Sequence, residues 1–209
     1  MTIYDLMPSI KDLIPYDYEH IRCAEYETVI ANFLQNCHRG NFFERISGAP
    51  GAGKTTFCQR LSDKNFLSFD KIMESLPSYQ NDLLKYGSKP AFANNEIIAR
   101  IIGYEILRRA IENKYSLVME HSGVNNAHLE LFTNLRKLHY KTKVDFIICD
   151  LNILLERVKL REAATMRHTP PNMVKQRFSL VNHYISKYQA VADEVKVYKS
   201  VNDTYEAIN

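Results

Sequence analysis

Short apolar runs alternate with longer amphipathic segments along most of this chain. Five runs have the length and composition of strands, at 42–47, 66–69, 115–119, 144–149 and 194–198. Between them, apolar residues spaced three and four apart predict helices at 53–62, 93–113, 126–139, 151–164 and 171–190. Strands that alternate with helices indicate parallel strands joined by right-handed crossovers. The pattern therefore predicts a three-layer α/β/α sandwich with a mainly parallel, five-stranded sheet.

Residues 1–40 precede the first strand and have a helical pattern. Apolar side chains recur there at helical spacing, at Ile21, Ala24, Val29, Ile30, Phe33 and Leu34. Arg39-Gly40 then predicts the end of this helical segment. We expect a helical extension over 1–40 that packs on a single domain formed by 41–209. A polar, proline-containing stretch from Pro77 to Pro90 is expected between the second strand and the long helix.

Residues 48–55 read Gly-Ala-Pro-Gly-Ala-Gly-Lys-Thr, a full match to the phosphate-binding loop G-x-x-x-x-G-K-[ST]. The glycines let successive N–H groups point inward at a polyphosphate, and the helix that follows adds its positive end. Lys54 reaches the β- and γ-phosphates, and the Thr55 hydroxyl ligates Mg²⁺. The loop therefore predicts that ATP or GTP binds with Mg²⁺. The residues expected to bind the nucleotide are Gly48, Ala49, Pro50, Gly51, Ala52, Gly53, Lys54, Thr55 and Thr56.

Acids follow three of the predicted strands: Asp70, Glu120 and Asp150. Ligands of open α/β sheets bind beyond the carboxyl ends of the strands, and phosphoryl transfer needs a carboxylate that orients or deprotonates the attacking hydroxyl. Asp70, at the tip of the second strand, is the candidate base, with helix N-capping as its alternative role. We expect Glu120 to contact Mg²⁺ through water, or to contact substrate together with Ser122. Asp150 is better explained as a helix cap.

Positive charge is concentrated after the fourth predicted strand, at Arg157, Lys159, Arg161, Arg167 and His168. Arg157 and Arg161 lie four apart and share one helix face, where pairing with neighbouring acids would explain them without a ligand. The segment nevertheless stands where small P-loop kinases have a mobile lid, and it ends in the stiff stretch 167–171 with two prolines. Guanidinium groups bind phosphate in bidentate fashion. We therefore expect a lid at about 151–175, with Arg161 and Arg167 on the transferring phosphate and Arg157 as a further contact.

Composition narrows the class of protein without naming a function. The 209 residues are 45% hydrophobic and 24% charged, which is ordinary for a globular chain with one sizeable core. There is no apolar run of about 20 residues and no N-terminal signal pattern, so we expect a cytoplasmic protein without a membrane role, although export without a signal stays open. The four cysteines have no metal-binding spacing, which favours a reduced protein. A net charge of +3 suits polyphosphates and does not require nucleic acid.

Four segments together resemble the zeta toxin family of P-loop kinases. The first is the loop segment 46–56, and the second is 69–79, which is similar to a family pattern of Asp, an aromatic-Arg pair and His-Pro-x-Tyr. The third, 119–123, is like the family's Glu before a small hydroxyl residue. The fourth, 161–170, is like the family's two lid arginines. The resemblance covers about residues 43–199. Met73 replaces the family's Arg and Leu76 its His, both where acceptor recognition is expected. The lid arginines are also closer together than in the family.

The resemblance implies that Asp70 activates the acceptor hydroxyl and that Arg161 and Arg167 steady the γ-phosphate. It also implies a small-molecule acceptor, in this family a nucleotide sugar such as UDP-N-acetylglucosamine, a role as toxin or effector, and an antitoxin protein as partner. The residues alone leave two other functions open. A polynucleotide or nucleoside kinase would use the same apparatus, and for a polynucleotide its binding would depend steeply on salt. A nucleotide-dependent switch would bind nucleotide and gain nothing from Asp70.

Overall fold

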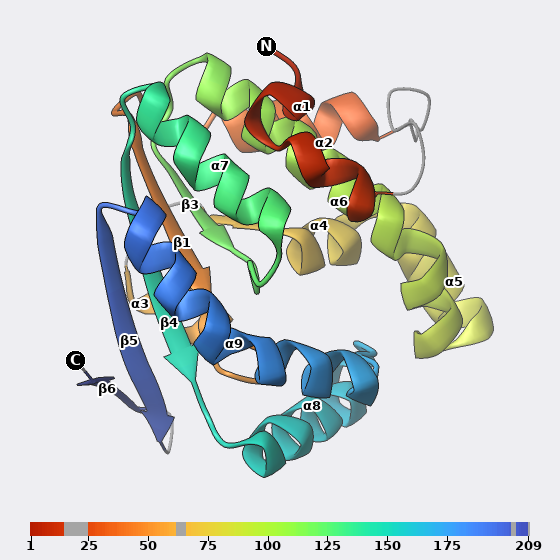
Figure 1. The fold of residues 1–209 in the computed structure, drawn as a ribbon. Coiled ribbons are helices and arrows are strands. Elements are labelled where there is room, and N and C mark those ends of the chain that lie inside the picture. The colour runs from red at the N-terminus through yellow and green to blue at the C-terminus, as the bar shows by residue number, and fades with distance from the viewer. Residues whose placement is uncertain (15–24, 62–65, 202–203, 209) are drawn as a thin grey trace.

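The fold is built on a six-stranded sheet, and the computed structural model describes residues 1–14, 25–61, 66–201 and 204–208 (Figure 1). The strand order is β2-β3-β1-β4-β5-β6. The strands are β1 (Phe42–Ser47), β2 (Phe66–Ser68), β3 (Leu117–Glu120), β4 (Lys141–Ile148), β5 (Glu194–Val201) and β6 (Thr204–Ile208). All neighbours pair in parallel except β5 and β6, which are antiparallel. The predicted α/β fold with a mainly parallel sheet is confirmed.

The sixth strand corrects the prediction of five. β6 lies at the edge of the sheet, and most of its residues are exposed, so its sequence lacks the alternation that marks a half-buried strand. It pairs with β5 from Val197 opposite Ile208 to Val201 opposite Thr204. The strand matters to the phosphate-binding loop, because the Tyr205 hydroxyl donates a hydrogen bond to the Gly53 carbonyl at 2.7 Å.

Helices flank the sheet on both faces, with α7 and α9 in front of it in Figure 1 and α3 behind it. In chain order the helices from the phosphate-binding loop onward are α3 (Lys54–Arg60), α4 (Phe69–Ser75), α5 (Pro77–Tyr86), α6 (Ser88–Glu112), α7 (Asn126–Lys137), α8 (Leu151–Thr165) and α9 (Pro171–Val191). Among the described residues, none of the helices has the length and apolarity needed to span a membrane. The predicted helices are therefore present, with shifted ends and with two additions, α4 and α5.

The stretch 77–90 is helical rather than an irregular polar connection. Pro77 occupies the first turn of α5, where its missing N–H removes no helical hydrogen bond. Gly87 ends this helix with φ of 85°, and α6 begins at the next residue. The prolines therefore start helices here instead of interrupting them.

The second strand ends earlier than predicted, which changes the position of Asp70. Ser68 is the last residue of β2 and the N-cap residue of α4. Asp70 consequently lies in the first turn of α4 rather than at a strand tip, and it is not the N-cap. A carboxylate in this turn is stabilised by the positive end of the helix.

Alternate residues of β1 point to opposite faces of the sheet and seed two clusters of buried side chains. Phe43 faces α7 and α9, with its ring centroid 5.4 Å from that of Phe132. Ile46 belongs to the smaller cluster, with Phe57 and Cys58 of α3. Cys58 is a free thiol, and burial raises its pKa to about 12, so it acts as a small buried hydrophobe.

The N-terminal segment packs on α6 and α7 through α1 (Ile3–Leu6), the 3₁₀ helix η1 (Pro8–Asp12) and α2 (Tyr26–Leu34). Its apolar side chains join the larger core: Ile3, Leu6, Met7, Ile10, Ile14, Tyr26 and Ile30 are buried. The predicted apolar positions at Ile21 and Ala24 lie outside the described residues.

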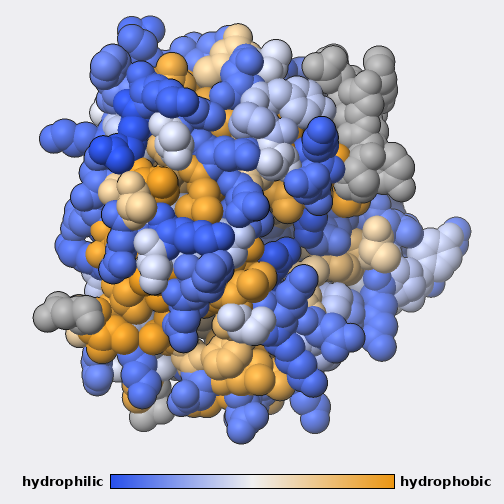
Figure 2. Space-filling model, viewed as in Figure 1, coloured by the Kyte–Doolittle hydropathy of each residue, from blue (hydrophilic) through white to orange (hydrophobic). Residues whose placement is uncertain are grey.

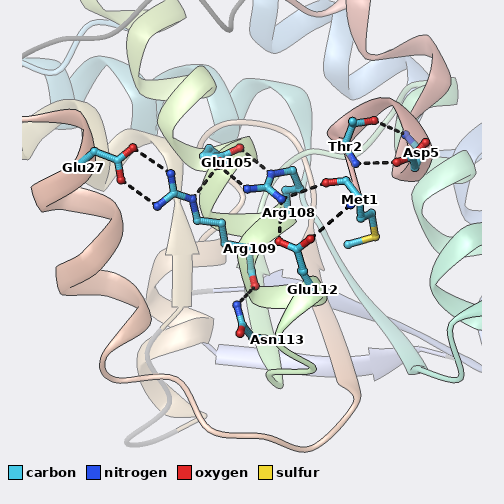
Figure 3. A network of polar contacts seen from close by, with 9 residues as sticks. All are labelled: Met1, Thr2, Asp5, Glu27, Glu105, Arg108, Arg109, Glu112 and Asn113. Atoms are coloured by element: carbon cyan, nitrogen blue, oxygen red, sulfur yellow. Dashed lines mark hydrogen bonds and ion pairs between the residues drawn. The ribbon is translucent and has the colours of Figure 1, made fainter.

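A network of ion pairs centred on Glu105 of α6 holds this segment in place (Figure 3). Glu105 is 7% exposed and accepts hydrogen bonds of 2.7 to 2.9 Å from Arg108 and Arg109. Both terminal nitrogens of Arg109 also donate hydrogen bonds to the Glu27 carboxylate of α2, at 2.8 and 2.9 Å. Arg108 donates to the Met1 carbonyl at 3.0 Å. Burial raises the pKa of Glu105, but the arginine hydrogen bonds outweigh it and the pKa lies below its usual value.

We expect Glu105→Gln to lower the free energy of unfolding by about 1.5–3 kcal/mol at pH 7, because charge-assisted hydrogen bonds to two arginines are weakened. A lowered folded-state pKa means that ionised Glu105 stabilises the fold above the unfolded pKa of about 4.3 and that this contribution is lost as the pH falls. Urea unfolding at pH 7 and pH 3 should therefore show a smaller difference between variant and wild type at pH 3.

The control is Glu112→Gln, whose side chain is 45% exposed and pairs with the same Arg108. This substitution should lower the free energy of unfolding by less than about 1 kcal/mol. Equal stability of Glu105→Gln and wild type at pH 7 would show that the network does not anchor the segment.

Candidate active site

A cleft of about 370 Å³ lies beyond the carboxyl ends of β1, β2 and β3. β1 lies between β3 and β4, so the strand order reverses there, which is where open α/β sheets bind ligands. The cleft is lined by the phosphate-binding loop and the start of α3, by the ends of β2 and β3, and by side chains of α4, α6, α8 and α9. Both the nucleotide-binding and the acid-bearing segments of the sequence therefore meet at one place.

The phosphate-binding loop has a backbone that only glycine adopts easily. Gly51 has φ of 86°, and a Cβ there would lie 2.6 Å from the carbonyl oxygen of Leu154 in α8. Gly53 has φ of 92° and is the N-cap residue of α3 without a side-chain cap. Among the described residues, no N-cap side chain therefore accepts from the first amides of α3, and amides of this kind at a helix N-terminus suit a phosphate.

Lys54 and Thr55 start α3 and point to different partners. The Lys54 ammonium donates to the Ala49 carbonyl at 3.1 Å. Burial lowers the pKa of Lys54, and the nearby carboxylates of Glu120 and Asp70 offset this only in part. The Thr55 hydroxyl donates to Oε1 of Glu120 at 2.8 Å, which joins the loop to the end of β3.

The pair of Thr55 and Glu120 fits a Mg²⁺ ion. Glu120 is 8% exposed, and its second oxygen, Oε2, is buried and has no hydrogen-bond partner among the described residues. A buried carboxylate oxygen is costly without a donor or a cation, and Mg²⁺ prefers hard oxygen ligands such as these. Within the described ranges no group of three or more His, Cys, Asp or Glu could hold a metal by itself. Phosphate oxygens would therefore have to complete the coordination.

The two arginines of the predicted lid, Arg161 and Arg167, both line the cleft, and Arg167 lies next to Asp70. Arg167 donates to Oε1 of Glu74 at 3.0 Å, and its second terminal nitrogen lies 3.6 Å from Oδ2 of Asp70. Arg161 donates to the Thr169 hydroxyl at 2.6 Å. Burial lowers the pKa of Arg161, and the positive charge of Arg167 lowers it further. The side chain of Asp70 is 48% exposed and that of Arg167 is 12% exposed, so a mostly buried guanidinium lies beside an accessible carboxylate.

Most of the other predicted site residues also line the cleft. Arg157 and Ser122 both line it. The Arg157 guanidinium also donates a hydrogen bond to the Ser200 hydroxyl at 3.0 Å. Of the nine predicted nucleotide-binding positions, Gly48, Ala49 and Ala52 are not among its lining residues. Ala49 and Ala52 face a second, apolar cavity behind the loop. Asp150 is the N-cap residue of α8 but makes no side-chain capping bond.

His121 belongs to the small polar turn that directly follows Glu120, and it lines the cleft. Its ring stacks on that of the buried His128, with 4.2 Å between centroids and 10° between planes. The Gly123 N–H donates to Nδ1 of His121 at 3.0 Å, so a neutral ring carries its proton on Nε2. Burial lowers the pKa of both imidazoles well below the usual value, and the neighbouring positive charges lower it further. His121 is therefore a neutral hydrogen-bond donor.

A fully buried arginine fixes the turn that carries His121. Arg45 of β1 is 0% exposed, donates to the Tyr188 hydroxyl at 2.8 Å and lies 4.1 Å from the centre of that ring. The Tyr188 hydroxyl in turn donates to the Gly123 carbonyl at 2.7 Å. A Cβ at Gly123, where φ is 65°, would lie 2.3 Å from Cζ of Arg45. No pattern in the sequence marks Arg45, because its partners come from α7 and α9.

The profile of the Zeta toxin family matches residues 45–207. Among solved structures, a chain of the PezAT chromosomal toxin–antitoxin system of Streptococcus pneumoniae has a TM-score of 0.73 and 14% identity, over 93% of this chain and 84% of that one. A chain of the AvrRxo1-ORF1:AvrRxo1-ORF2 complex, solved with sulphate ions, has a TM-score of 0.70 and 14% identity; the match covers 88% of this chain and 65% of that one. The AvrRxo1-ORF1:-ORF2 structure with ATP gives a TM-score of 0.67 at 12% identity, with the same coverage. No curated protein matches the chain. The similar solved structures show that the chain shares their fold.

The stacked imidazoles predict a pH-dependent stability. Their folded-state pKa lies below the unfolded value of about 6.5, so protons bind on unfolding and the free energy of unfolding falls as the pH drops from 7 to 5. The slope should reach up to about 1.4 kcal/mol per pH unit for each histidine. In urea unfolding, His121→Gln should give a shallower pH dependence than wild type.

The control is His183→Gln on the exposed side of α9, which should follow the wild-type curve. If His121→Gln ran parallel to wild type between pH 7 and pH 5, the imidazole would not be held neutral by its surroundings.

Proposed function

Because the chain belongs to the zeta toxin family, we propose that it is an ATP-dependent kinase that transfers the γ-phosphate to a hydroxyl of a small molecule and acts as a toxin or effector. One observation carries the proposal. The part of the phosphate-binding loop from Pro50 to Thr55 that lines the cleft lies there together with Glu120, Asp70 and two arginines of the predicted lid. A hydrolase or a switch needs the loop and the Mg²⁺ ligands, whereas the accessible carboxylate opposite them suits a hydroxyl acceptor.

The donor half of the cleft would bind the triphosphate with Mg²⁺. Lys54 and the amides at the start of α3 suit the β- and γ-phosphates, and the Thr55 hydroxyl and Glu120 suit the metal. When bound, Mg²⁺ neutralises charge that develops on the phosphate oxygens. ATP is favoured over GTP because a structural neighbour was solved with ATP. Arg157 would add a contact from α8.

The acceptor half would position and deprotonate the hydroxyl. Asp70 accepts its proton, and Arg161 and Arg167 stabilise the charge on the transferring phosphate. Arg167 is now shared between Glu74 and Asp70. A bound γ-phosphate would compete with these carboxylates for Arg167 and so free Asp70 for the acceptor.

A nucleotide sugar such as UDP-N-acetylglucosamine is the acceptor that the family suggests. The two departures from the family pattern bear on this point. Met73 is buried and lines the cleft, while Leu76 is buried and does not line it. Acceptor recognition therefore falls to other cleft residues. By analogy with the PezAT system, an antitoxin protein is the partner we propose.

We expect Asp70→Asn to lower kcat for phosphoryl transfer by about 10²- to 10⁴-fold, the range of a general base. Binding of a non-hydrolysable ATP analogue, measured by calorimetry, should stay within a few-fold of wild type. The matched control is Glu74→Gln, one turn further along α4, which removes the other carboxylate on Arg167. It should lower kcat less than tenfold, and equal losses in both variants would mean that Asp70 only holds Arg167.

Lys54→Ala should abolish measurable binding of the same ATP analogue, because the triphosphate loses its buried cation. Incubation of wild type with γ-labelled ATP and a pool of nucleotide sugars should label one of them, and Lys54→Ala should label none. A wild-type protein that binds ATP and labels no acceptor would favour the nucleotide-dependent switch instead.

A further inference from the structure

The edge hairpin of β5 and β6 reaches the phosphate-binding loop through one side chain, Tyr205. Its hydroxyl donates a hydrogen bond of 2.7 Å to the Gly53 carbonyl, 152 residues earlier in the chain. A Cβ on Gly53 would lie only 2.8 Å from this hydroxyl, so the glycine leaves the space that the hydroxyl fills. The carbonyl therefore has a partner that the loop itself does not supply.

The ring of Tyr205 is held by two side chains of α3. It packs edge-on against Phe57, with 5.0 Å between ring centroids, and the Arg60 guanidinium lies 4.8 Å from its centre. Ser200, directly opposite Tyr205 in the β5–β6 ladder, is 3% exposed and accepts a hydrogen bond of 3.0 Å from Arg157 of α8. The hydroxyl is therefore fixed relative to the loop by contacts of the hairpin with α3 and α8.

The bond acts on a peptide group that the proposed function uses. The Gly53 carbonyl also accepts the first hydrogen bond of α3, from the Phe57 N–H at 2.9 Å. The peptide bond between Gly53 and Lys54 is trans, so its carbonyl and its N–H point in opposite directions. Because Tyr205 and Phe57 hold the carbonyl, they also set the direction of the Lys54 N–H. Gly53 and Lys54 both line the cleft, and the first amides of a helix have no acceptor within that helix.

Gly53 gains more from such a restraint than a residue with a side chain would. Its φ of 92° lies in the left-handed region, and a glycine can leave this conformation at little cost. It is the N-cap residue of α3 and has no side chain that could brace the turn. A hydrogen bond to a peptide carbonyl also polarises the peptide group and strengthens its N–H as a donor. The Tyr205 hydroxyl thus both orients the Lys54 amide and makes it a better donor.

We propose that Tyr205 is a positioning residue for the donor phosphates: through the Gly53 carbonyl it holds the Lys54 amide in the direction in which this amide donates to the polyphosphate. The proposal rests on the proposed ATP-dependent function. It assigns part of the donor site to β6, an element outside the phosphate-binding motif. Only the hydroxyl is needed for this role, since the ring packs on α3 by itself. The bond should therefore matter to the binding of phosphates and not to that of the nucleoside.

Tyr205→Phe tests the role because it removes the hydroxyl and keeps the ring. In calorimetry with Mg²⁺, the variant should bind a non-hydrolysable ATP analogue about fivefold more weakly than wild type, or weaker still, because one restraint on the loop is lost. Binding of inorganic tripolyphosphate should weaken by the same factor. The measurements are made at a temperature at which thermal unfolding shows every variant to be fully folded.

The matched control is Tyr198→Phe. Tyr198 lies on β5 and packs on the same Phe57 ring, with 5.0 Å between centroids, but among the described residues its hydroxyl makes no hydrogen bond. This variant should bind both ligands within twofold of wild type.

The backbone amide signal of Lys54 in nuclear magnetic resonance gives a readout that a loss of stability alone would not move. In the nucleotide-free protein, Tyr205→Phe should shift this signal, because the carbonyl of the same peptide group loses a hydrogen bond. Tyr198→Phe should leave the signal in place. An unshifted Lys54 signal in Tyr205→Phe would show that the hydroxyl does not act on this amide.

Two binding results would also overturn the role of Tyr205. One is tripolyphosphate binding that is unchanged in Tyr205→Phe; if the ATP analogue alone bound more weakly, Tyr205 would act on the nucleoside. The other is an equal loss in Tyr198→Phe, which would indicate a general effect of the hairpin.

Steady-state kinetics separate a failure of this role from a failure of the proposed function. Tyr205→Phe should raise KM for ATP about fivefold or more and leave KM for the acceptor unchanged. If wild type labels an acceptor and the variant has the same KM for ATP, the positioning role is overturned and the kinase stands. No labelling of any acceptor would count against the kinase, and calorimetry with tripolyphosphate would still decide the role of Tyr205.

Discussion

The in-register pairing of β1 with β3 is the constraint on which the cleft depends. It sets Ile46 opposite Glu120, so the loop that follows β1 leaves the sheet beside the carboxylate that ends β3. The Thr55 hydroxyl can then reach Glu120 at 2.8 Å. A slip of one residue would turn Glu120 to the other face of the sheet and separate the two groups. The contact between Thr55 and Glu120 therefore depends on strand register as well as on the loop.

Buried positive charge is the second theme of the site. Arg45 is enclosed by aromatic rings, Arg161 and Arg167 are mostly buried, and Arg177 is unpaired among the described residues. Each costs desolvation free energy in the absence of an anion. Polyphosphate binding would offset that cost in the cleft, whereas Arg45 keeps its charge and instead fixes the turn at Gly123.

The N-terminal segment contributes to more than stability. The ion-pair network around Glu105 ties α1 and α2 to α6, and the Leu13 carbonyl accepts a hydrogen bond from Arg100 on the same helix. Because Arg100 lines the cleft, one side chain connects the N-terminal segment to the cleft wall. Met73, where the family has a polar residue, is buried and lines the same cleft.

The sequence alone was sufficient for the parts of the protein that depend on neighbouring residues. The loop at 48–55 encodes its own conformation through glycines with positive φ, and the apolar runs mark the buried parallel strands because both of their faces are covered. Asp70 could be named because it follows a predicted strand directly, and Arg161 and Arg167 because positive charge is concentrated after the fourth predicted strand. Contacts between distant segments could not be read in this way. The edge strand β6 is exposed and carries no pattern, Arg45 depends on rings from α7 and α9, and Arg100 and Arg177 meet only because two helices pack around one cleft. Local spacing fixes which face a residue takes, but only the packing of distant elements decides what that face meets.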